Sequence, residues 1–541
     1  MQSQELRDLA RKLKDNLSRL MEKRRNFESH WQEVSDYMLP RKAEITKDRA
    51  RGDKRHAKIF DSSATHALEL LAASLHGMLT SSANRWFALR FKETLLNESD
   101  EAKEWLEDAT ERMYVSFARS NFQQEIFECY HDLIAFGTAC LLIEEDEEDV
   151  LLFSARHIKE LYIQENKKGF IDCIYRRFKM PVEAVIEKFG IENVSRETQN
   201  IFKKSPFEDI DLVHVVKPRS VFDNKKMDKQ NMPFQSIYFE YQSGHILKLG
   251  GFKENPYIVS RYLKSSTEIY GRSPGMNALS EVKVLNKMVE HSLKAAAKQI
   301  DPPLLVPDDS MLSPIRMSPG SINYYRSGSR DRIETLQIGQ ASSVTLNSEN
   351  QRRDAIAKMF HVDQLLITEN RNMTATEVLQ RNEEKMRILG PVLGRLQSEL
   401  LEPLIIRVFN IMLRNKLFMP APDILQKQEL NIEYVSPMAL AQRGQELQSI
   451  MRGLEIFGSI SQALPVMDYI HEAGLVKNII KVLGLPAKVI KSDQEVQQIR
   501  QERQAQQQQQ MEIQQALQES QVAKNAAPAA KVLMDGAEQP Q

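Results

Sequence analysis

Apolar residues recur at three- and four-residue steps through the first part of the chain, which is the spacing of amphipathic helices. The first predicted helix ends at Pro40, because proline cannot donate the backbone hydrogen bond that a helix needs. Its apolar face is formed by Leu6, Leu9, Leu13, Leu17, Leu20, Phe27, Trp31, Val34 and Met38. Residues 41–58 are basic and lack periodicity, so we expect an exposed loop there. Helix is predicted again from Asp61, a candidate N-cap, and the whole segment to Leu96 is interpreted as helical.

The middle of the chain has a different pattern. A helix predicted from Ser99 to Phe136 ends at Gly137, and short apolar runs then alternate with turn residues up to Tyr262. This pattern predicts β-strands, with hairpin turns at residues 166–169 and 243–244. The acidic run 144–149 is expected in a solvated turn, because six adjacent carboxylates cannot converge on one metal ion.

Helical spacing returns over residues 269–300 and ends at Asp301-Pro302-Pro303. A compact proline-rich segment with short strand-like runs follows, and helix resumes near Asn347. The order is therefore helix, β-type insert, helix.

The segment from Met373 to Leu417 is predicted to be one long helix. Thr374 and Glu377 have the spacing of a capping box at its start. Gly390-Pro391 interrupts it, and a proline inside a helix costs roughly 3 kcal/mol, yet the helical spacing resumes at once. The pattern therefore predicts a bend at these two residues.

The C-terminal part, beyond Pro420, is again predicted to be helical, with breaks at prolines and glycine. Residues 494–521 are rich in glutamine and are compatible with either a helix or disorder. Disorder is the expectation from Ala526 onward, where the chain is polar and contains AAPAA.

Composition and motifs exclude several classes of protein. The 541-residue chain has 73 basic and 74 acidic side chains, so no global charge recruits nucleic acid. Its three cysteines fit buried thiols in a reducing cytosol, and no apolar run is long enough to span a bilayer. Phosphate-loop, dinucleotide-binding, zinc-protease and nucleophile-elbow motifs are absent. Asp209 with Asp211, and His66 with His76, lack the further ligands of a metal site. The sequence therefore predicts a protein that is not an enzyme and has no cofactor and no metal.

One group of residues suits DNA. Lys283, Lys287, Lys294 and Lys298 are spaced by four, seven and four residues. At about 100° per residue they fall within about 60° of one another, in a stripe about 22 Å long on the helix 269–300. Such a stripe is a solvated helix face, a surface that contacts phosphates, or part of an interface in which Glu281 and Glu290 of adjacent subunits pair with the lysines. Lysine, a mobile point charge, would contact passing DNA weakly and without regard to base sequence.

Four sequence blocks resemble the portal (head-to-tail connector) proteins of short-tailed, podovirus-type bacteriophages. They are MTATEVLQRNEEK with LGPVLGRLQSELLEPLI, AASLHGMLTSSANRWFALRF, AFGTACLLIEED and IYGRSPGMNALSEVKVLNKM, and the matching blocks extend from about Phe27 to Asn415 in the same order. The resemblance implies a mostly α-helical fold with an α+β wing and a small α/β clip, the portal fold of crown, wing, stem and clip, assembled as a ring.

The resemblance also implies a domain order. The first half would comprise a helical and β-rich wing region (1–268), the first stem helix (269–300), the clip (301–346) and the second stem helix (347–364). The second half would comprise a channel loop (365–373), the kinked wing helix (374–420), a helical wing or crown (421–493), a glutamine-rich crown or barrel helix (494–522) and a disordered tail (523–541). The channel loop would present Glu369, Asn370, Arg371 and Asn372.

By the same resemblance, the protein would form a homo-oligomeric ring, usually a dodecamer, at one vertex of the virion capsid, after assembly in the host cytoplasm. Double-stranded DNA would pass the lysine stripe without sequence specificity during packaging and ejection. The implied partners are the terminase large subunit, which supplies the ATPase, the major capsid protein, scaffolding protein, and tail adaptor and tail proteins, with no membrane. Two rival hypotheses are a structural tail or adaptor protein without a packaging role, and a DNA-processing enzyme.

Overall fold

The computed structural model describes the chain except for residues 1–3, 51, 93–99, 224–227, 230, 306–321, 323, 325–333, 336–342, 366–386, 422–429, 435–446, 448, 458, 460–473, 477–478, 480–492 and 536–541. The chain divides into two compact units. Unit 1 comprises residues 1–88, 110–419 and 432–441, and unit 2 comprises residues 89–109, 420–431 and 442–541.

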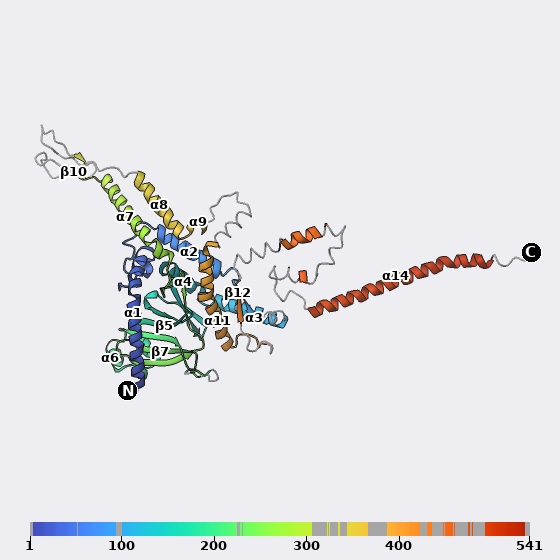
Figure 1. Ribbon diagram of the computed structural model, residues 1–541, viewed down its shortest axis with the longest axis horizontal. Coiled ribbons are helices and arrows are strands. Elements are labelled where there is room, and N and C mark those ends of the chain that lie inside the picture. The colour runs from blue at the N-terminus through green and yellow to red at the C-terminus, as the bar shows by residue number, and fades with distance from the viewer. Residues whose placement is uncertain are drawn as a thin grey trace, which may run out of the picture. The chain divides into compact units, whose positions relative to one another are not determined.

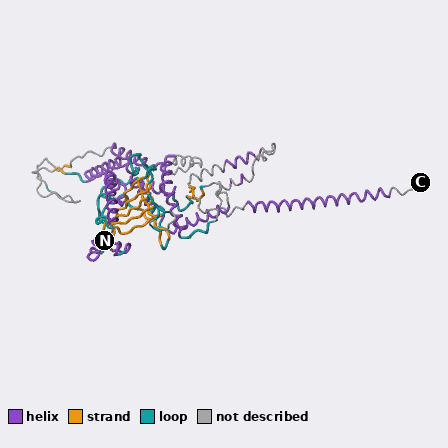
Figure 2. Tube along the Cα trace, turned by 60° about the horizontal axis from the view of Figure 1, so that its bottom comes forward, coloured by secondary structure: helices purple, strands orange, loops and turns teal. Residues whose placement is uncertain are grey.

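Two antiparallel sheets form the centre of unit 1, and Figure 2 shows their strands gathered in one block. The larger sheet has five strands in the order β4 (Leu161–Glu165), β5 (Ile171–Pro181), β6 (Asp209–Pro218), β7 (Phe234–Glu240) and β8 (Ile246–Phe252). The smaller sheet has the order β3 (Val150–Ala155), β2 (Thr138–Asp146) and β9 (Tyr257–Arg261). The predicted β region is therefore confirmed, and so are its two hairpin turns, which join β4 to β5 and β7 to β8.

Helices cover both faces of the larger sheet. Side chains alternate between the faces of a strand, and Val213 and Val215 of β6 pack with Leu13 and Leu17 of α1 (Gln4–Met38). The intervening Leu212 packs instead with Val185 and Phe189 of α5 (Val182–Phe189), the helix that follows β5. A second short helix, α6 (Arg196–Lys204), packs against α5. Figure 1 shows α1 along one side of this sheet. Sequence reasoning had interpreted the whole region as strands and missed α5 and α6, which are short.

The rest of unit 1 is mainly helical. Its helices include α2 (Ser63–Leu79), α4 (Phe122–Phe136), α7 (Pro274–Ile300), α8 (Ser343–Met359), α9 (Val362–Leu365) and α11 (Glu402–Arg414). The helices α7 and α8 pack side by side and project from the sheets (Figure 1). A short strand pair lies between them in sequence, β10 (Leu304–Leu305) with β11 (Glu334–Thr335). The predicted order of helix, β-type insert and helix is present among the described residues.

Two expectations for the N-terminal part were wrong. Residues 87–91, interpreted as helix, form the strand β1 (Phe87–Phe91), in which buried and half-buried side chains alternate. The Tyr114 hydroxyl also bonds the main chain at Trp86 and Phe87, a contact that local spacing could not reveal.

The single helix predicted between Ser99 and Phe136 is two helices, α3 (Asp100–Arg119) and α4. The break lies at Ser120-Asn121, where the Asn121 amide bonds both the carbonyl and the N–H of Phe153 in β3. A tertiary contact therefore overrides local helix propensity at this point.

The C-terminal part also differs from expectation. Beyond Pro420, where helix was predicted, residues 430–434 form the strand β12 (Leu430–Tyr434). The glutamine-rich segment is helical and belongs to α14 (Asp493–Asp535), so of the two alternatives for it the structure shows the helix. The helix α14 continues to Asp535, into the segment from residue 526 where disorder was expected. No helix in the described residues is both long and apolar enough to cross a membrane.

Candidate functional site

The lysine stripe lies on α7, whose start is well defined. Ser273 is the N-cap, its Oγ accepts a hydrogen bond of 2.9 Å from the N–H of Met276, and Pro274 occupies the first turn. Lys283, Lys287, Lys294 and Lys298 are all exposed on this helix. We call these four residues the lysine face. The structure thus brings them together on one side of α7, as the spacing predicted.

Carboxylates of the same chain hold three of the four lysines. Lys283 pairs with Glu33 of α1 at 3.1 Å, while Lys287 and Lys294 pair with Glu290 at 2.9 and 2.5 Å. Hydrogen bonds from Lys294 and Lys287 lower the pKa of Glu290 to about 2. Among the described residues, no salt bridge is found for Lys298.

The second stem helix of the sequence prediction, α8, packs on another side of α7. Glu281 of α7 forms a salt bridge with Arg352 of α8, and Ser292 Oγ donates to Glu349 Oε1 at 2.6 Å. At about 100° per residue, Glu281 and Ser292 lie about 130–150° around the helix from the centre of the lysine face. The lysine face therefore points away from α8.

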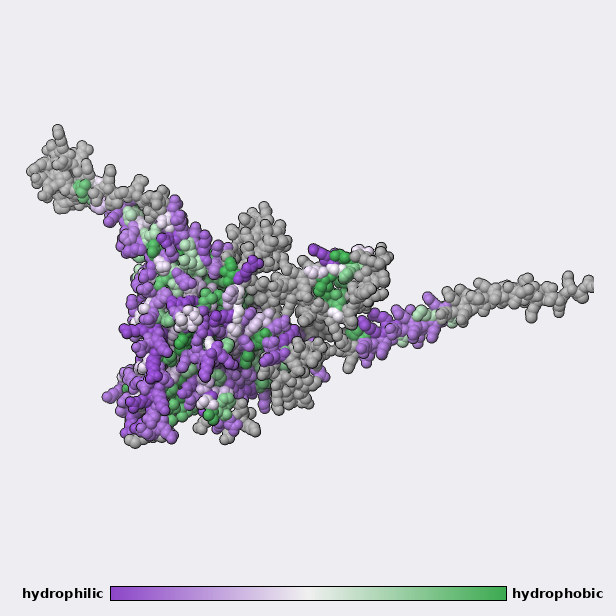
Figure 3. Space-filling model, in the orientation of Figure 1, coloured by the Kyte–Doolittle hydropathy of each residue, from purple (hydrophilic) through white to green (hydrophobic). Residues whose placement is uncertain are grey.

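Apolar residues remain exposed on the two flanks between these sides. Val284 is 43% exposed on one flank, and Leu293 and Ile300 are 55% and 85% exposed on the other. Figure 3 shows hydrophilic and apolar residues interspersed on the visible surface of the α7–α8 hairpin. Beyond its first turns, which also pack against α1 and α4, α7 thus has a packed side, a charged side and two apolar flanks.

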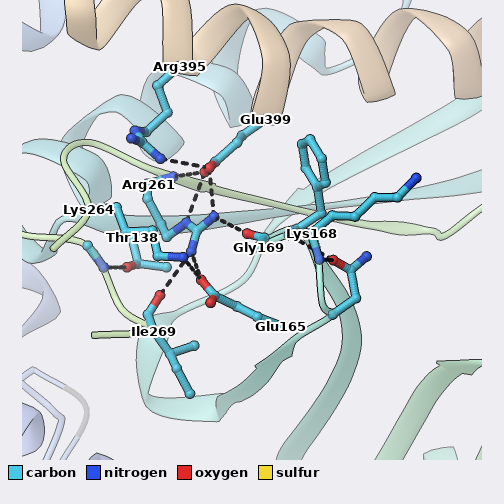
Figure 4. A network of polar contacts seen from close by, with 12 residues as sticks. Thr138, Glu165, Lys168, Gly169, Arg261, Lys264, Ile269, Arg395 and Glu399 are labelled. Atoms are coloured by element: carbon cyan, nitrogen blue, oxygen red, sulfur yellow. Dashed lines mark hydrogen bonds and ion pairs between the residues drawn. The ribbon is translucent and has the colours of Figure 1, made fainter. Parts of the chain in front are cut away.

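A buried charge network centred on Arg261 of β9 contacts the segment that leads into α7, at Ile269 (Figure 4). The Arg261 side chain is 1% exposed and forms salt bridges with Glu399 and Glu165, the former at 2.7 Å. It also donates to the carbonyl oxygens of Gly169, at 2.9 Å, and Ile269, at 3.3 Å. One guanidinium therefore joins β9, the β4–β5 hairpin, the segment that leads into α7, and the helix that carries Glu399.

Glycines allow the main chain to approach closely beside this network. A Cβ on Gly271 would lie 2.0 Å from the carbonyl oxygen of Gly137, so no other residue fits at position 271. Gly137 has a φ of 76° and ends α4 in the left-handed conformation. The N–H of Gly271 donates to Thr138 Oγ1 at 2.9 Å. Two sequence blocks noted for their family resemblance, around Gly137 and around Gly271, therefore meet in space. We call Gly137, Thr138, Arg261, Gly271 and Glu399 the junction.

Glu399 lies on a π-helical turn, Gln397–Leu401, which precedes α11. The N–H of Glu402 bonds the carbonyl of Gln397, as a π turn requires, and Pro403 follows with no N–H for the carbonyl of Glu399. We attribute the turn to this proline, because π turns relieve such a break in the α-helical ladder. Sequence reasoning missed both the turn and Arg261; Glu402-Pro403 was the available signal for the turn.

The predicted bend at Gly390-Pro391 stays a prediction. Residues 387–396 are α-helical through both positions, and a Cβ on Gly390 would meet nothing within 4 Å. The expected capping box at Thr374 and the channel-loop residues lie outside the described residues; these are Glu369, Asn370, Arg371 and Asn372.

The remaining candidates have structural partners. Asp211 forms a salt bridge with Arg177 at 2.8 Å, and His76 Nε2 lies 2.7 Å from Gln123 Oε1. The acidic run is only partly a turn: residues 144–146 belong to β2, where Glu145 pairs with Arg414 at 2.8 Å, because the β2–β3 pairing extends to Asp146. The three cysteines are buried, as predicted. In the part of the chain that the structure describes, no group of His, Cys, Asp or Glu is arranged to hold a metal ion.

Most described residues of the basic loop 41–58 are exposed, as predicted, but several of its cations are paired. Lys42 lies 2.6 Å from Asp132, and both Arg49 and Lys58 contact Asp36. These ion pairs join parts of the loop to α1 and α4.

Comparison with known proteins shows the family. The sequence profile described as "Bacteriophage head to tail connecting protein" matches residues 10–490, so the chain belongs to this family of phage connector proteins. The portal protein of Salmonella phage epsilon15 is 32% identical over 498 residues, which cover 90% of this chain and 89% of the relative. The probable portal protein of Bordetella phage BPP-1 is 32% identical over 487 residues, 88% of each chain. The portal protein of Enterobacteria phage T3 is 22% identical over 405 residues, 72% of this chain and 70% of the relative.

Proposed function

We propose that this protein is a phage portal protein, which forms a ring-shaped channel at one capsid vertex through which DNA is packaged and later ejected. The family match over residues 10–490 and the two portal relatives at 32% identity support this function. Its place is the virion. The terminase large subunit would dock during packaging, and the tail adaptor and tail proteins afterwards, with capsid and scaffolding proteins as assembly partners.

The observation that carries the mechanism is the four-sided character of α7. Each helix in a closed ring has one side that faces the channel, one side that faces outward, and two flanks that face the adjacent subunits. In α7 the side away from α8 carries the lysines, and both flanks expose apolar side chains, at Val284 on one and at Leu293 and Ile300 on the other. Burial of these flanks against adjacent subunits would form the ring, since apolar burial stabilises association by about 25 cal/mol per Å².

The lysine face then lines the lumen, with α8 outside it. A duplex presents one phosphate charge per roughly 1.7 Å of its axis, so mobile ammonium groups meet phosphates at every stage of passage. Lysine contacts are sequence-blind and individually weak, which suits a channel that DNA must slide through. In this assignment α7 and α8 are the stem, and the insert between them is the clip.

The experiment compares heads built with wild-type protein and with Lys283, Lys287, Lys294 and Lys298 all changed to alanine. Rings should form normally, whereas retention of packaged DNA should decrease, and the difference should grow as salt is lowered, because wild-type contacts strengthen with a longer Debye length. The matched control replaces Lys203 and Lys204 at the end of α6. Failure of the quadruple variant to form rings would mean that the lysines hold subunits together and do not line the lumen.

A further inference from the structure

Glu290 lies within the lysine face, between Lys287 and Lys294. We propose that Glu290 competes with DNA phosphates for these two lysines and so limits how strongly the channel holds DNA. This inference rests on the proposed function, because it requires the lysine face to line the lumen. It adds a residue that limits the strength of the DNA contact, whereas the lysines only provide that contact.

The geometry places the carboxylate where a phosphate would have to bind. One oxygen of Glu290 lies 2.9 Å from the Lys287 ammonium and the other lies 2.5 Å from that of Lys294. At about 100° per residue, Glu290 is within about 80° of every lysine of the face. The carboxylate is therefore shared by two cations at the surface that would meet DNA.

The charge of the face is reduced as a result. Lys283 is held in the same way by Glu33, at 3.1 Å, so four lysines share two carboxylates and the face keeps half of its positive charge. All three pairs are solvent-exposed on the lysine side, with lysine side chains 44%, 64% and 65% exposed. Exposed pairs of this kind are weak and break readily.

A weak internal competitor has a specific effect on sliding. Each lysine can leave Glu290 for a phosphate and return as the phosphate moves on, so the ammonium group is always close to an anion. The free-energy difference between DNA positions with and without lysine–phosphate contacts is therefore smaller than it would be with uncompensated lysines. The barrier to sliding decreases as a result. Removal of the carboxylate would therefore strengthen and prolong DNA contact.

The chain offers a matched control at Glu281. It lies on the same helix but about 180° from Glu290, and it pairs with Arg352 of α8. Glu281→Gln therefore removes the same charge from the same helix without changing the lysine face. This substitution separates an effect of net charge from an effect of position.

The experiment uses full-length rings fitted into a solid-state pore, through which a linear duplex is driven at fixed voltage. Glu290→Gln should lengthen the dwell time of the duplex relative to wild type and relative to Glu281→Gln. The dwell time should also depend more steeply on salt, with a log–log slope larger by about one to two, because each freed lysine adds about 0.9 when it neutralises one phosphate. At about 1 M salt, where the Debye length is about 3 Å, the variants should converge. Ring yield and melting temperature should not change, so a structural role would not produce this result.

Three outcomes would overturn the inference. If Glu290→Gln equals wild type while the quadruple lysine variant shortens the dwell time, the lysines line the channel but Glu290 does not compete with phosphate. An equal effect of Glu290→Gln and Glu281→Gln would attribute the result to net charge. If neither the lysine variant nor Glu290→Gln changes the dwell time, the assignment of the lysine face to the lumen is wrong as well.

Discussion

Replacement of Glu399 by alanine tests the energetic importance of the junction. Glu399 accepts hydrogen bonds from the N–H, Nε and Nη2 of Arg261, and the two side chains are 8% and 1% exposed. Removal of one partner from a buried pair costs about 3–5 kcal/mol, because the other charge is left unpaired. Glu165 still contacts Arg261, so we expect the lower end, about 3 kcal/mol.

The assay is hydrogen exchange on assembled rings, because the N–H of Arg261 is itself bonded to Glu399 at 3.0 Å. A loss of about 3 kcal/mol corresponds to roughly a hundredfold faster exchange by local opening in β9 and in the segment leading to α7. Glu402→Ala, at an exposed position of the same helix, is the control and should exchange like wild type. Unchanged protection of β9 in Glu399→Ala would show that the Arg261–Glu399 pair does not stabilise the junction.

Further predictions concern glycine, proline and histidine. Gly271→Ala should prevent assembly of folded rings, seen by size-exclusion chromatography, because its Cβ overlaps the carbonyl of Gly137, whereas Gly390→Ala should be tolerated. Pro391→Ala should straighten or rigidify its helix, leaving rings intact while packaged-DNA retention falls; a reconstruction with a straight helix at Pro391 would remove the reason for this expectation. Burial lowers the pKa of His214 well below 6.5, so the unfolded chain binds a proton that the folded chain does not, and the urea midpoint should fall as pH decreases below about 6.5. His214→Gln should reduce that fall.

Patterns with a local physical cause were predictable from the sequence. The spacing of Leu13 and Leu17 predicted the buried side of α1, and Gly137 predicted the end of α4. The four lysines of α7 share a face because helix geometry alone determines it. The family resemblance pointed to the segments around Gly137 and Gly271, which the structure brings into contact.

Features that depend on contacts distant in sequence were not predictable. Arg261 is 138 residues from Glu399, and nothing in either local segment indicates the pair. The break at Asn121 depends on β3, and the strand β1 depends in part on Tyr114. By contrast, the pairs of Glu290 with Lys287 and Lys294 follow the three- and four-residue spacing that places side chains together on a helix.

Cryo-electron microscopy of the purified full-length protein would show whether this chain forms a closed channel lined by the lysine face. We predict a closed ring with a central channel, with adjacent subunits contacting through Val284 on one side and Leu293 and Ile300 on the other. The ammonium groups of the lysine face should line the lumen, with α8 outside. Monomers or an open filament at micromolar concentration would contradict the portal assignment. A closed ring with the lysine face on its outer surface would contradict the DNA-contact mechanism.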